Sequence, residues 1–113
     1  RRSRGISFGQ MVQQLARYLL GWRAYFSFCE TLSVLRDLDS WIRRRLRSVV
    51  WKQWKTYQRR RRGLQRQGLS DRDAAQAAYY ARNVWRTANS QPMKIAFPNA
   101  FFDSLGLPRL VAP

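Results

Sequence analysis

Histidine is absent from this 113-residue chain, and cysteine occurs once, at Cys29. The lack of histidine and of a cysteine pair excludes the common zinc sites and every histidine-based catalytic triad. One cysteine cannot form an internal disulfide, which fits a reducing cytoplasm. Because Cys29 lies in an apolar run, we expect it to be a small buried side chain rather than a reactive thiol.

Acidic residues are also scarce: six stand against 22 lysines and arginines, and the formal net charge is +16. Such an excess repels itself in the folded state, so we expect a polyanion to match it. Most of the cations are arginines, whose planar fork suits phosphate. Polymerases and nucleases need clustered acidic residues to hold two metal ions. The few acids here are dispersed, so we expect no catalytic residue, no metal site and no cofactor in this segment.

Long apolar runs are missing too. The most apolar window, Tyr18 to Phe28, is interrupted by Arg23 and is shorter than the roughly 20 residues of a membrane span. No signal-peptide pattern is visible. We therefore expect a soluble protein without a membrane partner. The chain opens on Arg1 rather than Met, so we expect a fragment or a processed product.

The stretch from Val34 to Arg62 contains neither glycine nor proline, and its periodicity predicts one long helix. On a helical wheel one side carries the apolar positions Leu35, Leu38, Ile42, Leu46, Val49 and Tyr57. The other side carries Arg36, Arg43, Arg44, Arg47 and Lys55. A nearly single-signed face favours anion binding over a solvated surface. We predict that Trp51 is structural, whereas Trp54 fits a core position and an RNA contact equally well.

Local signals predict the remaining helices. Ser7 and Gln10 have capping-box spacing, which predicts a first helix to about Cys29. Its apolar face comprises Met11, Leu15, Tyr18, Leu19, Trp22, Tyr25 and Phe26. Gly21 within it either admits a close neighbour or is merely tolerated. We expect Asp37 and Asp39 to serve the dipole and salt bridges of the second helix rather than a metal, and Gly63 or Gly68 to end it.

Towards the C-terminus, Ser70 and Asp73 predict the start of an alanine-rich third helix that runs to about Asn83. Residues 84–89 fit either a helix or an extended segment, and Ser90-Gln91-Pro92 breaks the pattern. A last short helix should begin near Pro98 and stop at Gly106. The predicted fold class is all-α: a small helical bundle with one long basic helix and a short C-terminal helix.

Three strings carry a family resemblance: LARYLLGWRAYF (residues 15–26), LRDLDSWIRRRLRSVVWKQWK (35–55) and PNAFFDSLGLPRL (98–110). They resemble the maturase-specific region of group II intron-encoded reverse transcriptases, in the expected order and over nearly the whole chain. The lead-in RRSRGISF is similar to the exit from the polymerase palm in that family. The resemblance implies a basic lead-in from a palm domain (1–9), thumb-like helices (10–68), and C-terminal maturase-specific helices with a tail (69–113).

The function that the resemblance implies is non-catalytic RNA binding. The family's region, called thumb or domain X, grips the template–primer duplex and binds intron RNA, which supports splicing, retrohoming and reverse transcription. The implied partners are intron RNA, the template–primer duplex and the palm of the same protein. The implied location is the cytoplasm of a bacterial-type cell, with the nucleoid or a ribonucleoprotein. The YADD-type aspartates and the divalent metal, Mg²⁺, belong to the palm of the parent polymerase, and no such motif stands here.

Carried over to this sequence, the RNA-facing helix predicts contacts to the nucleic-acid backbone. The predicted residues are Arg43, Arg44, Arg47, Lys52 and Lys55, extended by Arg36 and by Arg59, Arg60, Arg61 and Arg62, with Trp54 as a stacking surface. Arg17 and Arg23 would flank the same groove. The predicted core comprises Leu15, Leu19, Trp22, Phe26, Leu38, Ile42 and Leu46. Two alternatives remain open: a cationic amphipathic module for membrane surfaces, and a module that binds an acidic protein.

Overall fold

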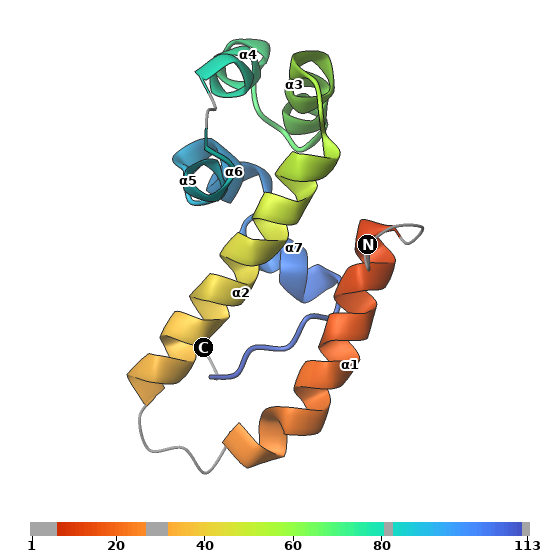
Figure 1. Cartoon of the computed structure of the whole chain (residues 1–113), viewed down its shortest axis with the longest axis vertical. Coiled ribbons are helices and arrows are strands. Elements are labelled where there is room, and N and C mark those ends of the chain that lie inside the picture. The colour runs from red at the N-terminus through yellow and green to blue at the C-terminus, as the bar shows by residue number, and fades with distance from the viewer. Residues whose placement is uncertain (1–6, 27–31, 81–82, 112–113) are drawn as a thin grey trace. The chain divides into compact units, whose positions relative to one another are not determined.

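The computed structural model describes residues 7–26, 32–80 and 83–111, and every regular element in these ranges is an α-helix (Figure 1). The helices are α1 (Phe8–Phe26), α2 (Leu32–Gln53), α3 (Tyr57–Arg66), α4 (Asp71–Tyr80), α5 (Val84–Ala88), α6 (Gln91–Ala96) and α7 (Asn99–Ser104). The predicted all-α class is confirmed. The chain forms two compact units: unit 1 comprises Arg1–Ile42 and Ala100–Pro113, and unit 2 comprises Arg43–Asn99.

Helix α1 begins with the predicted capping box. The Ser7 hydroxyl accepts the Gln10 N–H at 3.1 Å, and the Ser7 N–H donates to the Gln10 side chain at 3.0 Å. These two bonds satisfy backbone donors that a helix start leaves open. The far end is described as far as Phe26, so the prediction for Cys29 falls outside the described residues, as does the Phe26 side chain.

The buried side of α1 differs from the predicted one. Val12, Ala16 and Leu19 are buried, whereas Tyr18 and Tyr25 are 63% and 69% exposed. Trp22 is exposed as well, so its placement in the core is wrong. The apolar residues of α1 cover a wide arc, and periodicity alone cannot choose which part of it is buried. The Tyr18, Trp22 and Tyr25 rings instead contact one another in a row, at centroid distances of 6.3 and 5.4 Å.

The C-terminal segment of unit 1 lies between α1 and the first half of α2 (Figure 1). The Gln13 amide donates to the Leu105 carbonyl at 2.7 Å. On α2, the Asp39 carboxylate accepts the N–H groups of Leu110 and Val111 at 2.9 to 3.2 Å. Because α2 starts at Leu32, Asp37 and Asp39 lie beyond its first turn, where the helix dipole is weak. Their predicted dipole role is therefore wrong, and Asp39 holds the C-terminal backbone instead.

Helix α2 ends at Gln53, so the predicted single helix to Arg62 is wrong. The chain turns at Trp54 to Thr56, and α3 begins with Thr56 as its N-cap, whose hydroxyl accepts the Arg59 N–H at 3.2 Å. At the other side of the turn the Arg60 guanidinium donates to the Trp54 carbonyl at 2.6 Å. Side chains thus satisfy both helix ends without any glycine or proline at the turn.

The ring of Trp54 packs on the backbone of Gly63 in α3. A Cβ atom added to Gly63 would lie 2.4 Å from Cζ2 of Trp54, so only glycine fits this contact. The Trp54 ring also contacts Trp51 and Phe97, with centroids 6.1 and 5.7 Å apart. Trp51 is 1% exposed, which confirms its predicted structural role. Gly63 therefore lies inside α3, and Gly68, at φ +104°, follows the end of α3, so neither glycine ends the second helix as predicted.

Unit 2 is completed by three short helices, α4, α5 and α6. Helix α4 packs against α3 and buries Ala74 and Ala78. The Ser70 hydroxyl accepts the Asp73 N–H at 3.1 Å, which confirms the predicted start. Residues 84–88 form α5, and the helical pattern breaks before Gln91, as predicted, because Ser90 is the N-cap of the next helix, α6. Helix α7, which belongs to unit 1 from Ala100 onward, begins just after Pro98, as predicted, and Gly106 follows it at φ +89°.

The buried apolar side chains divide between the units. Unit 1 buries Val12, Ala16, Leu19, Leu35, Ile42, Phe102, Leu107 and Leu110. Unit 2 buries Leu46, Val50, Trp51, Leu64, Leu69, Ala74, Ala78, Ala88, Met93, Ala96 and Phe97. Of the predicted core, Leu19, Ile42 and Leu46 are confirmed, while Leu15 and Leu38 are half-buried.

The substitution Asp39→Ala removes the acceptor for two backbone N–H groups. We expect it to lower the free energy of unfolding by about 2 kcal/mol, since hydrogen bonds to charged groups contribute about 1.5–3 kcal/mol. Urea denaturation would measure the loss. Asp37→Ala, two residues away on the exposed surface, is the control, and we expect a change within about 0.5 kcal/mol. Equal losses in the two variants would contradict the role of Asp39.

The substitution Gly63→Ala places a methyl group inside the Trp54 ring. We expect it to destabilise the chain by about 1–3 kcal/mol, the usual cost of overpacking. Gly21→Ala is the matched helical control, because no described atom lies within 4 Å of a Cβ at Gly21. That variant should gain stability, by up to ~1 kcal/mol, from helix propensity. Thermal unfolding of both proteins checks the opposite signs.

Candidate nucleic-acid interface

Two arginines of the predicted cationic face of α2 are inside the protein. Arg43 and Arg47 are only 2% and 6% exposed. The Arg47 guanidinium donates to the Phe97 carbonyl at 2.8 Å. Burial, and secondarily the charge of Arg43, lowers the pKa of Arg47. The predicted separation of an apolar and a cationic face is therefore wrong in this half of α2.

Arg44 is half-buried, and its side chain also makes hydrogen bonds within unit 2. Its Nε and Nη2 donate to the Trp85 carbonyl at 2.9 and 2.7 Å, and its guanidinium carbon lies 4.0 Å from the centroid of the Trp85 ring. The acceptors of Arg44 and Arg47 share one property. Trp85 lies in the last turn of α5 and Phe97 is the C-cap of α6, where carbonyls lack helical partners. These arginines thus cap helix ends.

The run Arg59 to Arg62 divides by role. Arg60 caps the end of α2 through the Trp54 carbonyl, and its guanidinium carbon lies 4.7 Å from the Trp51 ring centroid. Burial lowers the pKa of Arg60. Arg61 donates twice to one carboxylate oxygen of Asp71, at 2.8 and 2.5 Å. Two of the four cations, Arg60 and Arg61, therefore make contacts that stabilise unit 2.

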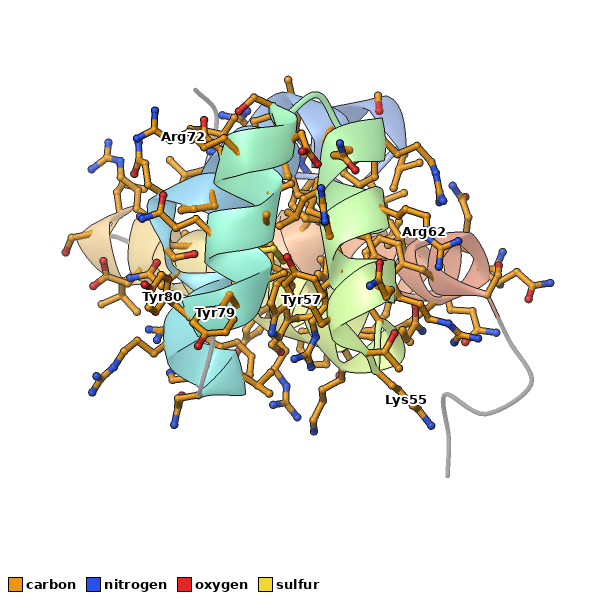
Figure 2. All side chains as sticks on the ribbon, turned by 90° about the horizontal axis from the view of Figure 1, so that it is seen from above. Lys55, Tyr57, Arg62, Arg72, Tyr79 and Tyr80 are labelled. Atoms are coloured by element: carbon orange, nitrogen blue, oxygen red, sulfur yellow. The ribbon has the colours of Figure 1, made fainter. Side chains whose placement is uncertain are left out.

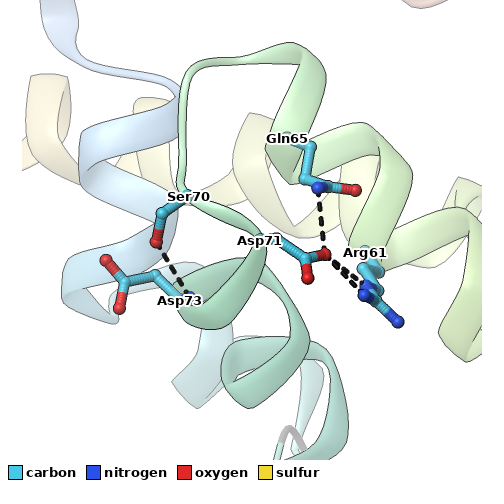
Figure 3. A network of polar contacts seen from close by, with 5 residues as sticks. All are labelled: Arg61, Gln65, Ser70, Asp71 and Asp73. Atoms are coloured by element: carbon cyan, nitrogen blue, oxygen red, sulfur yellow. Dashed lines mark hydrogen bonds and ion pairs between the residues drawn. The ribbon is translucent and has the colours of Figure 1, made fainter.

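The ion pair of Arg61 joins α3 to the start of α4 (Figure 3). The amide of Gln65 donates to the same Asp71 oxygen at 3.0 Å. The hydrogen bond to Asp71 is the main cause of the raised pKa of Arg61. Asp71 and Asp73 occupy the first turn of α4, where carboxylates favour the positive end of the helix dipole. The scarce acids of this region serve helix packing.

The other two members of the run, Arg59 and Arg62, are exposed and line a hollow of about 250 Å³. Arg66 joins them, because its spacing of i+4 from Arg62 places it on the same face of α3. Gln53 and Trp54 complete the lining. In the described part of the chain, no acidic side chain pairs with Arg59, Arg62 or Arg66. Figure 2 shows Arg62 on the α3 side of the helix pair, opposite Arg72 on the α4 side.

The structure brings together only some of the predicted contact residues. Trp54, Arg59 and Arg62 share the hollow. Lys52, in the last turn of α2, and Lys55, in the turn that follows, are both exposed. Arg17 and Arg23 on α1, and Arg36 on the first half of α2, are exposed in unit 1.

Sequence reasoning missed Gln53 and Arg66. The spacing of Arg59, Arg62 and Arg66 would have revealed Arg66 if the restart of the helix at Tyr57 had been recognised. No local signal marks Gln53, because the turn at Trp54 to Thr56 alone brings it to the hollow.

No three histidine, cysteine or carboxylate side chains among the described residues are grouped as a metal ion would need. None of the described helices combines the length and apolar character needed to cross a bilayer.

Residues 1–68 match the family model of the group II intron maturase-specific domain. The chain belongs to this family. The resemblance found in the sequence is thereby confirmed. A comparison with curated proteins found no match. The matched region of this maturase-specific chain contains α1, α2 and α3 and ends at Gly68, the glycine that follows α3. All five residues of the hollow lie within it.

The division of the arginine run predicts that substitutions at neighbouring positions change the stability by unequal amounts. Arg60→Ala removes the cap of α2 and the contact with Trp51, so we expect a loss of about 1.5–3 kcal/mol. Arg59→Ala leaves the backbone N–H that Thr56 caps, and we expect a change within about 0.5 kcal/mol. Urea unfolding of the two variants checks the difference. A run that acts only as a solvated surface would give two small and similar effects.

Proposed function

We propose that this maturase-specific chain is an RNA-binding, non-catalytic region of a group II intron reverse transcriptase, and that it binds intron RNA to support splicing and reverse transcription. The observation that carries the proposal is the face of α3, where Arg59, Arg62 and Arg66 line one hollow without an acidic partner. A rigid helix that holds three cations in a row can neutralise neighbouring phosphates, and each neutralised phosphate releases counterions.

The proposal also includes the template–primer duplex and the palm domain as partners, and it assigns them to other parts of the chain. Lys52 and Lys55, both exposed, extend the cationic surface towards a second polyanion, the template–primer duplex. Residues 1–9 would lead in from a palm domain of the same protein, and residues 10–68 and 69–113 would be its thumb-like and C-terminal parts. Polymerisation and its Mg²⁺ would belong to that palm. A cytoplasmic ribonucleoprotein is the corresponding location.

Charge removal in the hollow tests the proposal. We expect wild-type binding to a transcribed group II intron RNA to weaken steeply with salt. The triple variant Arg59→Gln, Arg62→Gln, Arg66→Gln should bind several-fold more weakly at moderate salt. Its slope of log affinity against log salt should be shallower by about 2 to 3, since each lost phosphate contact removes about 0.7–0.9. Filter binding across a salt series measures both quantities.

The matched control is Arg72→Gln, Arg86→Gln, Lys94→Gln. These three cations are exposed on α4, α5 and α6 of the same unit. Because both triple variants remove three positive charges, they change the net charge by the same amount. We expect the control to change the slope less than the hollow variant does. Equal changes in both triple variants, or wild-type affinity independent of salt, would overturn the proposal. Displacement of the RNA by anionic vesicles or an acidic protein as readily as by unlabelled RNA would instead favour a membrane-surface or acidic-partner module.

A further inference from the structure

The hollow on α3 contains more than a cluster of charge. Its polar lining consists of three arginines and the amide of Gln53, none of which makes a side-chain hydrogen bond in the described part of the chain. Each guanidinium offers five donors, and the Gln53 amide offers both donors and an acceptor. The ligand that fits this lining is anionic, rich in acceptors, and carries a group with both donors and acceptors at its edge.

The aromatic component is Trp54. Its ring is held by Gly63, Trp51 and Phe97, and its half-exposed remainder lines the hollow. A ring fixed by three neighbours offers a flat surface that loses no side-chain freedom on binding. Nucleobases stack on such rings irrespective of their identity. A phosphate alone would contact the arginines but would use neither the exposed part of the Trp54 ring nor the Gln53 amide.

The size of the hollow suits one residue of a nucleic-acid chain. Pockets that hold whole small molecules span about 300–1,000 Å³, and this hollow, at about 250 Å³, lies just below that range. It therefore has room for one planar group beside its phosphate. A base stacked inside a duplex cannot enter a recess, whereas a base in a loop, bulge or single strand can be splayed out.

We infer that the hollow formed by Gln53, Trp54, Arg59, Arg62 and Arg66 is a binding site for one unpaired nucleotide. The base lies against the Trp54 ring with its edge towards the Gln53 amide, and the flanking phosphates lie on the arginines. This inference rests on the proposed RNA binding and adds the class of RNA that the site selects. The chain should thus distinguish unpaired segments from duplex through this site.

The test compares a short unstructured RNA with a blunt RNA duplex of the same length. The duplex has the higher charge density, so electrostatics alone predicts tighter binding of the duplex. We expect the opposite order, with roughly tenfold tighter binding of the single strand, which corresponds to one base–aromatic contact. Fluorescence anisotropy with the full chain measures both affinities.

Two glutamine variants separate the site from general charge. Gln53→Ala leaves the net charge unchanged and should reduce the preference for the single strand at least about threefold, through the loss of hydrogen bonds to the base. Gln58→Ala is the control: Gln58 is exposed on α3 and does not line the hollow, so the preference should remain. A second measurement is photo-cross-linking of a single strand that carries 5-iodouridine, with the adduct expected at Trp54.

The outcomes distinguish this inference from the proposed function. Equal affinity for both RNAs, equal effects of Gln53→Ala and Gln58→Ala, or cross-links only outside the hollow would each overturn the nucleotide site. Salt-dependent RNA binding that the arginine triple variant weakens would still support the proposed function in those cases. Failure to bind either RNA would overturn both.

Discussion

The contact between the Trp54 ring and the backbone of Gly63 is the constraint on which the candidate site depends. It holds α3 against the end of α2, so the chain turns at Trp54 to Thr56 and does not continue as one helix. The turn places Gln53 beside residues of α3 that a continuous helix would carry away from it. The same turn leaves carbonyls at the end of α2, and Arg60 caps one of them. The turn at Trp54 to Thr56 therefore determines both the packing of α3 on α2 and the geometry of the candidate site.

Arginine has two physical roles in this protein, and the shortage of acids explains the division. With 22 cations and six acids, most cations cannot have a carboxylate partner. Arg44, Arg47 and Arg60 use carbonyls near helix C-termini as acceptors instead. Such carbonyls have no helical partner and lie at the negative end of the helix dipole, so a guanidinium satisfies both requirements. Among the described residues, Arg59, Arg62 and Arg66 are exposed and have no such acceptor.

Membership of the maturase-specific family and the geometry of unit 2 point to the same segment. The family match ends where α3 ends, and the hollow lies near the end of that match. Helix α4 lies outside the matched segment but affects it, because Asp71 of α4 holds Arg61 on the side of α3 that faces α4. That pairing leaves Arg62 to the opposite side. A short acidic helix start thus helps to determine which arginines of the run are paired within unit 2 and which stay exposed.

The sequence by itself determined the all-α class, the family and the excess of positive charge. It also determined the helix starts at Ser7 and Ser70, because a capping box depends on residues only three positions apart. Only the tertiary structure decided where α2 ends and which arginines are buried. Trp54 and Arg47 both contact Phe97, more than 40 residues away in the chain, and no local pattern encodes such a contact. A reading based on helical periodicity assigns every arginine to the surface. Arg47 is buried because the Phe97 carbonyl inside unit 2 accepts its hydrogen bond.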